Sequence, residues 1–124
     1  MNIIILGAGQ VGSSVAENLA SEANDITLVD SNATLLSDLS DRYDIQTVVG
    51  HASHPDILKK AGIRDADMLV AVTNSDETNI VACQVANSLF LTLTKIARVR
   101  SQEYLKYKAL FDKSDWPIKV LIRP

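Results

Sequence analysis

The chain has 124 residues and a mass of 13.5 kDa, which suits one compact domain and leaves no room for the two-domain plan of most dehydrogenases. Hydrophobic residues make up 47% and charged residues 22%, which is typical of a globular protein and excludes a disordered chain. The net charge of −3 gives no basic footprint for nucleic acid, so we expect no nucleic-acid partner.

The apolar runs and the cysteine content bear on the cellular compartment. The first apolar run, residues 3–6, is too short to span a membrane. The single cysteine, Cys83, has no partner cysteine for a disulfide or a metal site, and we expect it to be a small apolar helix residue. These features predict a cytoplasmic protein.

Short apolar runs rich in β-branched residues alternate along the chain with segments of helical spacing. The predicted strands are residues 3–6, 26–29, 47–49, 68–72 and 96–99. Apolar residues recur at helical spacing within positions 11–19, 35–39, 57–61 and 80–89. Beyond these elements, a last helix is predicted over residues 102–111 and a sixth strand over residues 118–122.

Several of the predicted helices begin or end at typical cap residues. The candidates are Ser31 or Asn32 before the second helix, Ser53 or His54 with Pro55 before the third, Gly62 after the third, and Asn74 with Glu77 as a capping box before the fourth.

Alternation of strands and helices, with strands apolar along most of their length, predicts a parallel sheet covered on both faces. The fold class is therefore α/β, a Rossmann-type doubly wound parallel sheet in a single domain over residues 1–124, with strand order 3-2-1-4-5-6. Because the chain stops soon after an apolar run, we expect a continuation after Pro124.

The motif GAGQVG, residues 7–12, follows the first predicted strand directly and opens the first helix, the context that a dinucleotide-binding motif needs. Its glycines allow a tight turn, close approach of a pyrophosphate to the backbone, and close packing of helix on strand. The helix start adds amide donors and a positive dipole end. A glycine turn without ligand is the alternative. The predicted phosphate-binding residues are Gly7, Ala8, Gly9, Gln10, Val11 and Gly12.

Asp30 ends the second predicted strand, where this fold places a carboxylate on the ribose hydroxyls. A carboxylate there repels a 2′-phosphate, which favours NAD or NADH over NADP. ATP and ADP carry the same adenosine ribose and stay candidates. A turn or cap role before Ser31 is the alternative for Asp30.

Polar residues also close the fourth and fifth strands. Thr73 and Asn74 lie at the predicted reversal of strand order, where we expect them to contact the ligand, although capping alone explains Asn74 equally well. If the fifth strand extends to Arg100, alternation places Arg98 and Arg100 on the same face or edge, and Arg98 is the better placed to bind a phosphate bidentately. A solvated charge is the alternative for Arg98.

The loop GHASHP follows the third predicted strand. His51 and His54 have no Cys or carboxylate nearby at ligand spacing, so we expect no metal site. The loop lies near the adenine side of such a fold, and His51 and Ala52 are therefore predicted to contact the base.

A catalytic constellation is not recognisable in the sequence. Tyr104 and Lys108 have the Tyr-x-x-x-Lys spacing of short-chain dehydrogenases, but the glycine pattern of those enzymes differs. We interpret both residues as an exposed helix face. With no Walker lysine and no Ser-His-Asp set, we expect a protein that is not an enzyme and binds its nucleotide unchanged.

Taken together, these segments resemble a known family. IIILGAGQVG, ITLVDSN, GHASHPDILKKAGIRDADMLVAVTNSDETNIVACQVA and KIARVR closely resemble the N-terminal nucleotide-binding (RCK/KTN) domains of bacterial potassium uptake regulators. The resemblance implies a cytoplasmic regulatory subunit, peripheral on the inner face of the membrane. It further implies that the subunit binds NAD or NADH, and in related systems ATP or ADP, and gates a potassium-translocating membrane protein.

The resemblance also assigns residues and assembly. It implies phosphate contacts from 7–11, a ribose contact from Asp30, contacts near the cleft from Thr73 and Asn74, and a phosphate contact from Arg98. Many relatives carry an acidic residue after the glycine that matches Gly50, whereas this chain has His51. A homodimer or higher oligomer is implied as well.

Two other functions are compatible with a nucleotide-binding fold. One is the cofactor-binding fragment of an NAD-dependent oxidoreductase, which needs a catalytic domain after Pro124. The other is a nucleotide-sensing DNA-binding regulator, which the acidic charge disfavours.

Overall fold

The computed structural model describes residues 1–92, 94–107, 109–112 and 118–121. Over these residues, six strands form one parallel sheet in the order β3-β2-β1-β4-β5-β6, which confirms the predicted doubly wound topology. The strands are β1 (Asn2–Leu6), β2 (Asp25–Asp30), β3 (Gln46–Val49), β4 (Met68–Ala71), β5 (Thr94–Arg98) and β6 (Lys119–Leu121).

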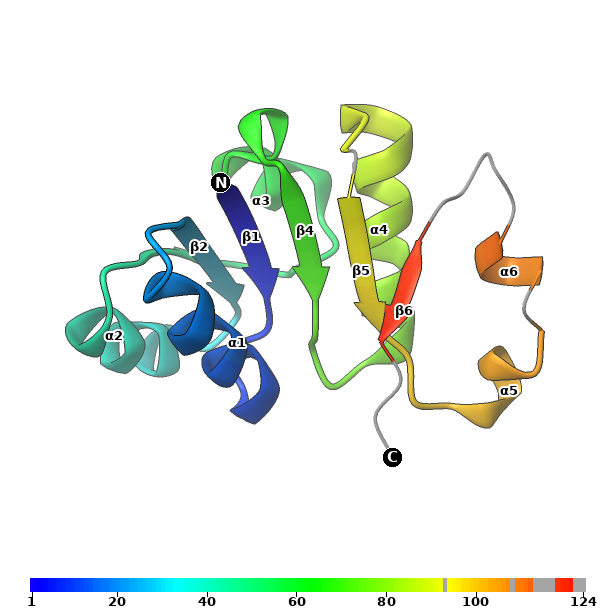
Figure 1. Ribbon diagram of the computed structural model, residues 1–124, viewed down its shortest axis with the longest axis horizontal. Coiled ribbons are helices and arrows are strands. Elements are labelled where there is room, and N and C mark those ends of the chain that lie inside the picture. The colour runs from blue at the N-terminus through cyan, green and yellow to red at the C-terminus, as the bar shows by residue number, and fades with distance from the viewer. Residues whose placement is uncertain (93, 108, 113–117, 122–124) are drawn as a thin grey trace.

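Helices cover both faces of the sheet, α1 and α2 on one and α3 and α4 on the other (Figure 1). Their bounds are α1 (Gln10–Ala20), α2 (Ala33–Arg42), α3 (Pro55–Lys60), the 3-10 helix η1 (Ile63–Asp65), α4 (Asp76–Phe90), α5 (Gln102–Leu105) and α6 (Ala109–Asp112). In the described part of the chain, no helix has the length and apolar character needed to cross a membrane.

The central strand β1 divides its side chains between two cores. Ile3 and Ile5 pack with α1 and α2, whereas Ile4 and Leu6 pack with α3 and α4. Successive side chains of a strand point to opposite faces, so a strand covered on both sides must be apolar throughout. This is why the run at residues 3–6 is continuous rather than alternating.

Most of the predicted helix ends are confirmed. Asn32 caps α2, with its Oδ1 accepting from the amides of Thr34 at 3.0 Å and Leu35 at 3.1 Å. Gly62, which follows α3, has a φ of 90°, the left-handed conformation that favours glycine at this position.

The capping box predicted for Asn74 and Glu77 is wrong. Ser75 caps α4, and its hydroxyl accepts from the amide of Thr78 at 3.1 Å. The amide of Ser75 in turn donates to the hydroxyl of Thr73 at 3.2 Å, a local turn that makes Ser75 the residue before the helix. Glu77 accepts instead from the hydroxyl of Tyr104 at 2.7 Å.

The single helix predicted over residues 102–111 is also wrong, because the described residues form two short helices, α5 and α6. Most described residues of this segment are exposed, and among them only Tyr104, Leu105 and Phe111 pack against the core. A helix this short gains little from its own hydrogen bonds and depends on packing. The sixth strand is confirmed at Lys119–Leu121, and residue 122 of its predicted range lies outside the described residues.

Candidate functional site

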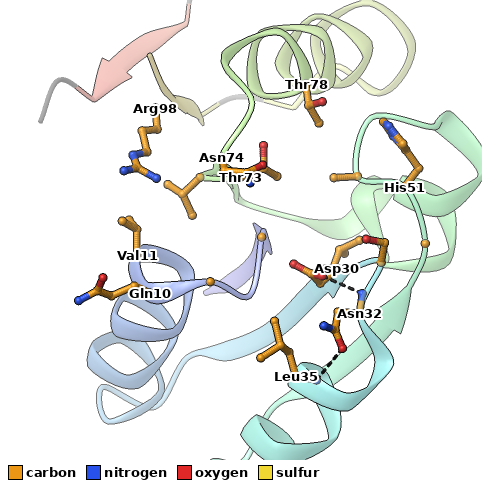
Figure 2. A pocket seen from close by; sticks show the side chains of 17 residues that line it. Gln10, Val11, Asp30, Asn32, Leu35, His51, Thr73, Asn74, Thr78 and Arg98 are labelled. Carbon is orange, nitrogen blue, oxygen red and sulfur yellow. Dashed lines mark hydrogen bonds between the residues drawn. The ribbon is translucent and has the colours of Figure 1, made fainter. Parts of the chain in front are cut away.

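A cleft of about 580 Å³ opens at the carboxyl ends of the strands, where the strand order reverses between β1 and β4 (Figure 2). Its volume is typical of small-molecule sites. Most of the predicted site residues line it: Gly7, Gly9, Gln10, Val11, Asp30, His51, Ala52, Thr73, Asn74 and Arg98. Ala8 and Gly12 do not line the cleft. The amide of Ala8 donates to Asp30, and Gly12 packs against the backbone of Gly7.

The glycines of residues 7–12 differ in what surrounds them. Gly7 has a φ of 105°, and a Cβ there would lie 2.9 Å from the backbone of Thr73. A Cβ on Gly12 would lie 1.7 Å from the carbonyl oxygen of Gly7, so the helix packs directly on the turn. A Cβ on Gly9 would meet nothing within 4 Å, since this residue faces the cleft.

The N-terminus of α1 faces the same cleft. Gly9 occupies the N-cap position, no side chain caps the helix, and the first turn contains no acidic residue. The first amides of a helix have no partner within it, and here Gln10 and Val11 border the cleft. Exposed amides together with the helix dipole form a site for an anion such as a phosphate.

Asp30 joins the glycine turn to the start of α2. Its Oδ2 accepts from the amide of Ala8 at 2.8 Å, and its Oδ1 accepts from the amide of Asn32 at 2.8 Å. Each carboxylate oxygen has a second acceptor site, and Asp30 borders the cleft. The carboxylate of Asp30 therefore stabilises the turn before α2, as the alternative interpretation predicted, and it keeps acceptor sites for the hydroxyl groups of a ligand.

Arg98 is the one permanent cation among the described residues that line the cleft. Its Nε is buried and has no hydrogen-bond partner in the described part of the chain. Figure 2 shows Arg98 across from Gln10 and Val11 at the start of α1. A buried guanidinium nitrogen without a partner is costly, which indicates that an anion belongs beside it.

Arg100 does not share this environment. β5 ends at Arg98, and the guanidinium of Arg100 donates to the carbonyl oxygen of Asn74 at 2.8 Å, outside the cleft lining. Asp76 holds the backbone here, accepting from the amides of Arg100 at 3.0 Å and Ser101 at 2.7 Å. Arg98 and Arg100, predicted to share a face, thus differ in environment. Arg98 lines the cleft, whereas the guanidinium of Arg100 bonds to the backbone of Asn74.

Sequence analysis missed several residues at the site. Asn32, Leu35 and Thr78 line the cleft, and Asn79 is buried directly behind it. The signal for Asn79 is a polar side chain next to the apolar run that begins at Ile80, on a helix whose inner face is otherwise apolar.

His51 lies toward the opposite end of the cleft from Arg98 (Figure 2). Its ring stacks on His54 with the centroids 4.3 Å apart, and its Nδ1 lies 3.1 Å from the hydroxyl of Ser53. Within the described residues, no group of three or more His, Cys, Asp or Glu side chains is placed to hold a metal ion.

The remaining reactive candidates lie away from the cleft. Cys83 is buried in α4, and burial raises the pKa of its thiol to about 12, which suits an inert apolar residue. The hydrogen bond to Glu77 raises the pKa of Tyr104, which does not line the cleft. Lys108, the second residue of the Tyr-x-x-x-Lys spacing, lies outside the described residues.

Comparison with known proteins identifies the family of the chain. The TrkA-N domain family matches residues 3–114. The Trk system potassium uptake protein TrkA of Vibrio alginolyticus is 62% identical over the whole chain, which spans 27% of that relative's length.

Solved structures share the fold at lower identity. The TrkA-N domain of the inner membrane protein ybaL from Escherichia coli is 20% identical, with a TM-score of 0.80 over 98% of this chain and 86% of that one. The GsuK channel bound to NAD is also 20% identical, with a TM-score of 0.78 over 97% of this chain and 21% of that one. On the extent of the family match and the identity to its relatives, the chain belongs to the TrkA-N domain family.

Proposed function

We propose that this chain is the nucleotide-binding domain of a potassium uptake regulator and that NAD or NADH binds in the cleft. The observation that carries the proposal is the unpartnered Nε of Arg98, which lies in one cleft with the uncapped start of α1 and with Asp30. Two sources of positive potential and one carboxylate match a ligand with phosphates and a ribose diol.

Each part of the cleft has a distinct part in binding. The amides at the start of α1 and the guanidinium of Arg98 would hold phosphates, and the free acceptor sites of Asp30 would hold ribose hydroxyls. The same carboxylate would repel a 2′-phosphate, which disfavours NADP. His51, Ala52 and Thr78 border the end of the cleft left for the base. ADP and ATP share these groups and are included in the proposal.

The proposed role is regulatory rather than catalytic, and the bound nucleotide would supply charge and contacts, not a reaction. A ligand shifts a protein between two states only by binding them with different affinity. We propose that this difference gates a potassium-translocating membrane subunit of the Trk type. The relatives named as potassium uptake proteins support this partner. We further propose a homodimer or higher oligomer, cytoplasmic and peripheral on the inner face of the membrane.

Thermal unfolding in the presence of NADH, NAD, ADP, ATP or NADPH, each in parallel, tests the ligand. A ligand at about 100 times its dissociation constant adds about 2.7 kcal/mol to the free energy of unfolding. For a domain of this size, such a gain raises Tm by several degrees. A shift with NADH or NAD supports the proposal, and no shift with any of the five would contradict it. A shift with NADPH alone would refute the role of Asp30, and consumption of NADH by the chain would refute the regulatory role.

A further inference from the structure

Asn79 makes an unusually complete set of hydrogen bonds from a fully buried position in α4. Its Oδ1 accepts from the amide of Thr73 at 2.9 Å and from the hydroxyl of Thr73 at 2.6 Å. Its Nδ2 donates to the carbonyl oxygens of Thr73 at 3.1 Å and Arg98 at 2.8 Å. A side-chain amide has two donors and two acceptor sites, so every one is used.

These bonds connect two strands at a point where the sheet no longer does. The ladder between β4 and β5 ends with the pair Ala71 and Ala97. Thr73 and Arg98 lie beyond that pair, and both line the cleft. Asn79 therefore joins the loop after β4 to the last residue of β5, just past the point where the ladder between these two strands ends.

Two elements hold the backbone of Arg98: it pairs with Leu121 of β6 on one side, and its carbonyl oxygen accepts from Asn79 on the side that faces β4. The Nε of Arg98 has no partner in the described residues, so this nitrogen does not anchor the side chain. The following residues are held separately, because Asp76 accepts from the amides of Arg100 and Ser101. Loss of the Asn79 bond would thus remove the link between Arg98 and Thr73, while the pairing with β6 and the loop after Arg98 stay in place.

We infer that Asn79 is a positioning residue of the cleft, which fixes Arg98 relative to Thr73 so that the guanidinium meets a phosphate of the ligand. Asn79 itself is covered by Thr73 and touches no ligand. The inference rests on the proposed nucleotide site. It names Asn79 as the residue that positions Arg98, the side chain proposed to bind a phosphate of the nucleotide.

The variant Asn79→Asp separates positioning from shape. Asp keeps the volume and the acceptor for Thr73 but lacks the NH₂ group: ionised it has no donor, and protonated it has a single O–H for the two carbonyl oxygens of Thr73 and Arg98. Cys83→Ser is the matched control, because Cys83 is equally buried on the same helix and contacts neither cleft residue through an observed hydrogen bond. Both changes place a poorly satisfied polar group in the interior of α4.

Calorimetric titration with ADP and with adenosine measures the coupling to Arg98. In the parent and in Cys83→Ser, Arg98→Ala is expected to lower ADP affinity about tenfold. In Asn79→Asp, the same replacement is expected to lower it less than about twofold, because the guanidinium is already displaced. Adenosine affinity should change little in every case. An undiminished effect of Arg98→Ala in Asn79→Asp would overturn the inference, since a role in stability alone leaves that effect intact.

A second measurement needs no variant and covers the case in which Asn79→Asp does not fold. The side-chain amide protons of Asn79 are expected to exchange slowly with water and to shift more on addition of ADP than of adenosine. Equal shifts, or none, would overturn the inference. Failure of the parent protein to bind NADH, NAD, ADP or ATP would overturn the proposed function as well, whereas ADP binding with uncoupled Arg98 would overturn this inference alone.

Discussion

Gly12 lies against the carbonyl oxygen of Gly7, so closely that a Cβ on Gly12 would be 1.7 Å from that oxygen. The contact seats the first turn of α1 on the end of β1. Gly9, between them, has open space where its Cβ would be. One motif thus contains a glycine required for packing, Gly12, and a glycine that faces the cleft, Gly9. Substitutions at these two positions should therefore affect different properties.

Gly12→Ala should destabilise the fold, and Gly9→Ala should impair binding. The clash at Gly12 is with backbone that cannot move without shifting β1, so we expect a loss of about 3 kcal/mol or more in the free energy of unfolding. At Gly9 the loss should stay within about 1 kcal/mol, the cost of alanine at an N-cap. Urea unfolding measures both. Normal ADP binding by a folded Gly9→Ala variant would argue against phosphate contact at this turn.

Asp30→Asn should weaken both the turn and the ribose contact. An Asn side chain presents its NH₂ group to one of the two amides now bonded to Asp30, those of Ala8 and Asn32. We expect a loss of about 2 kcal/mol in stability and weaker binding of adenosine, with a smaller preference for NADH over NADPH. Asp41→Asn, the same charge change at an exposed residue of α2, is the control. An unchanged preference between NADH and NADPH would count against the ribose role.

Arg98→Ala and Arg100→Ala should differ, although the residues are two apart. Removing Arg98 should lower ADP affinity about tenfold and leave adenosine affinity nearly unchanged, because only ADP carries phosphates. Arg100 does not line the cleft, and its removal deletes only a hydrogen bond to the carbonyl oxygen of Asn74. ADP affinity should therefore fall much less than in Arg98→Ala. Calorimetry with both ligands decides this, and equal losses of ADP and adenosine affinity in Arg98→Ala would refute its phosphate role.

The buried thiol of Cys83 predicts a stability loss in alkali. Because burial raises its pKa from 9.0 to about 12, the unfolded state loses this proton first and stability falls as pH rises from 9 toward 12. The slope from one such group approaches about 1.4 kcal/mol per pH unit. Measured relative to Cys83→Ala, unfolding free energies should show this decline. At pH 8 the native thiol should also resist alkylation, and rapid labelling without unfolding would contradict its burial.

The strand order was predictable because each strand leaves a local pattern. Ile3 to Leu6 is apolar at every position, which only burial on both faces explains, and the alternation with helices then limits the topology. Gly7 and Gly12 were predictable for a similar reason, since a Cβ at either position would clash with backbone, whereas Gly9 has open space there and was predictable only from the motif.

Other features depend on specific side-chain contacts that the spacing of residues along the chain does not reveal. Ser75 rather than Asn74 caps α4 because of a turn made with Thr73. Asn79 bonds to Arg98, nineteen residues away, and no spacing rule points to that pairing. The helix is interrupted between α5 and α6 because few of its residues pack against the core. The spacing of apolar residues in the sequence does not reveal how much of a helix is packed.

The reversal of strand order has a consequence for folding. One wall of the cleft comes from residues 7–52 and the other from residues 72–98, and they meet only when β4 inserts beside β1. Neither half of the chain contains the whole cleft. A ligand that touches both walls must therefore stabilise the domain against global unfolding rather than against local opening, and its binding reports that both halves have assembled.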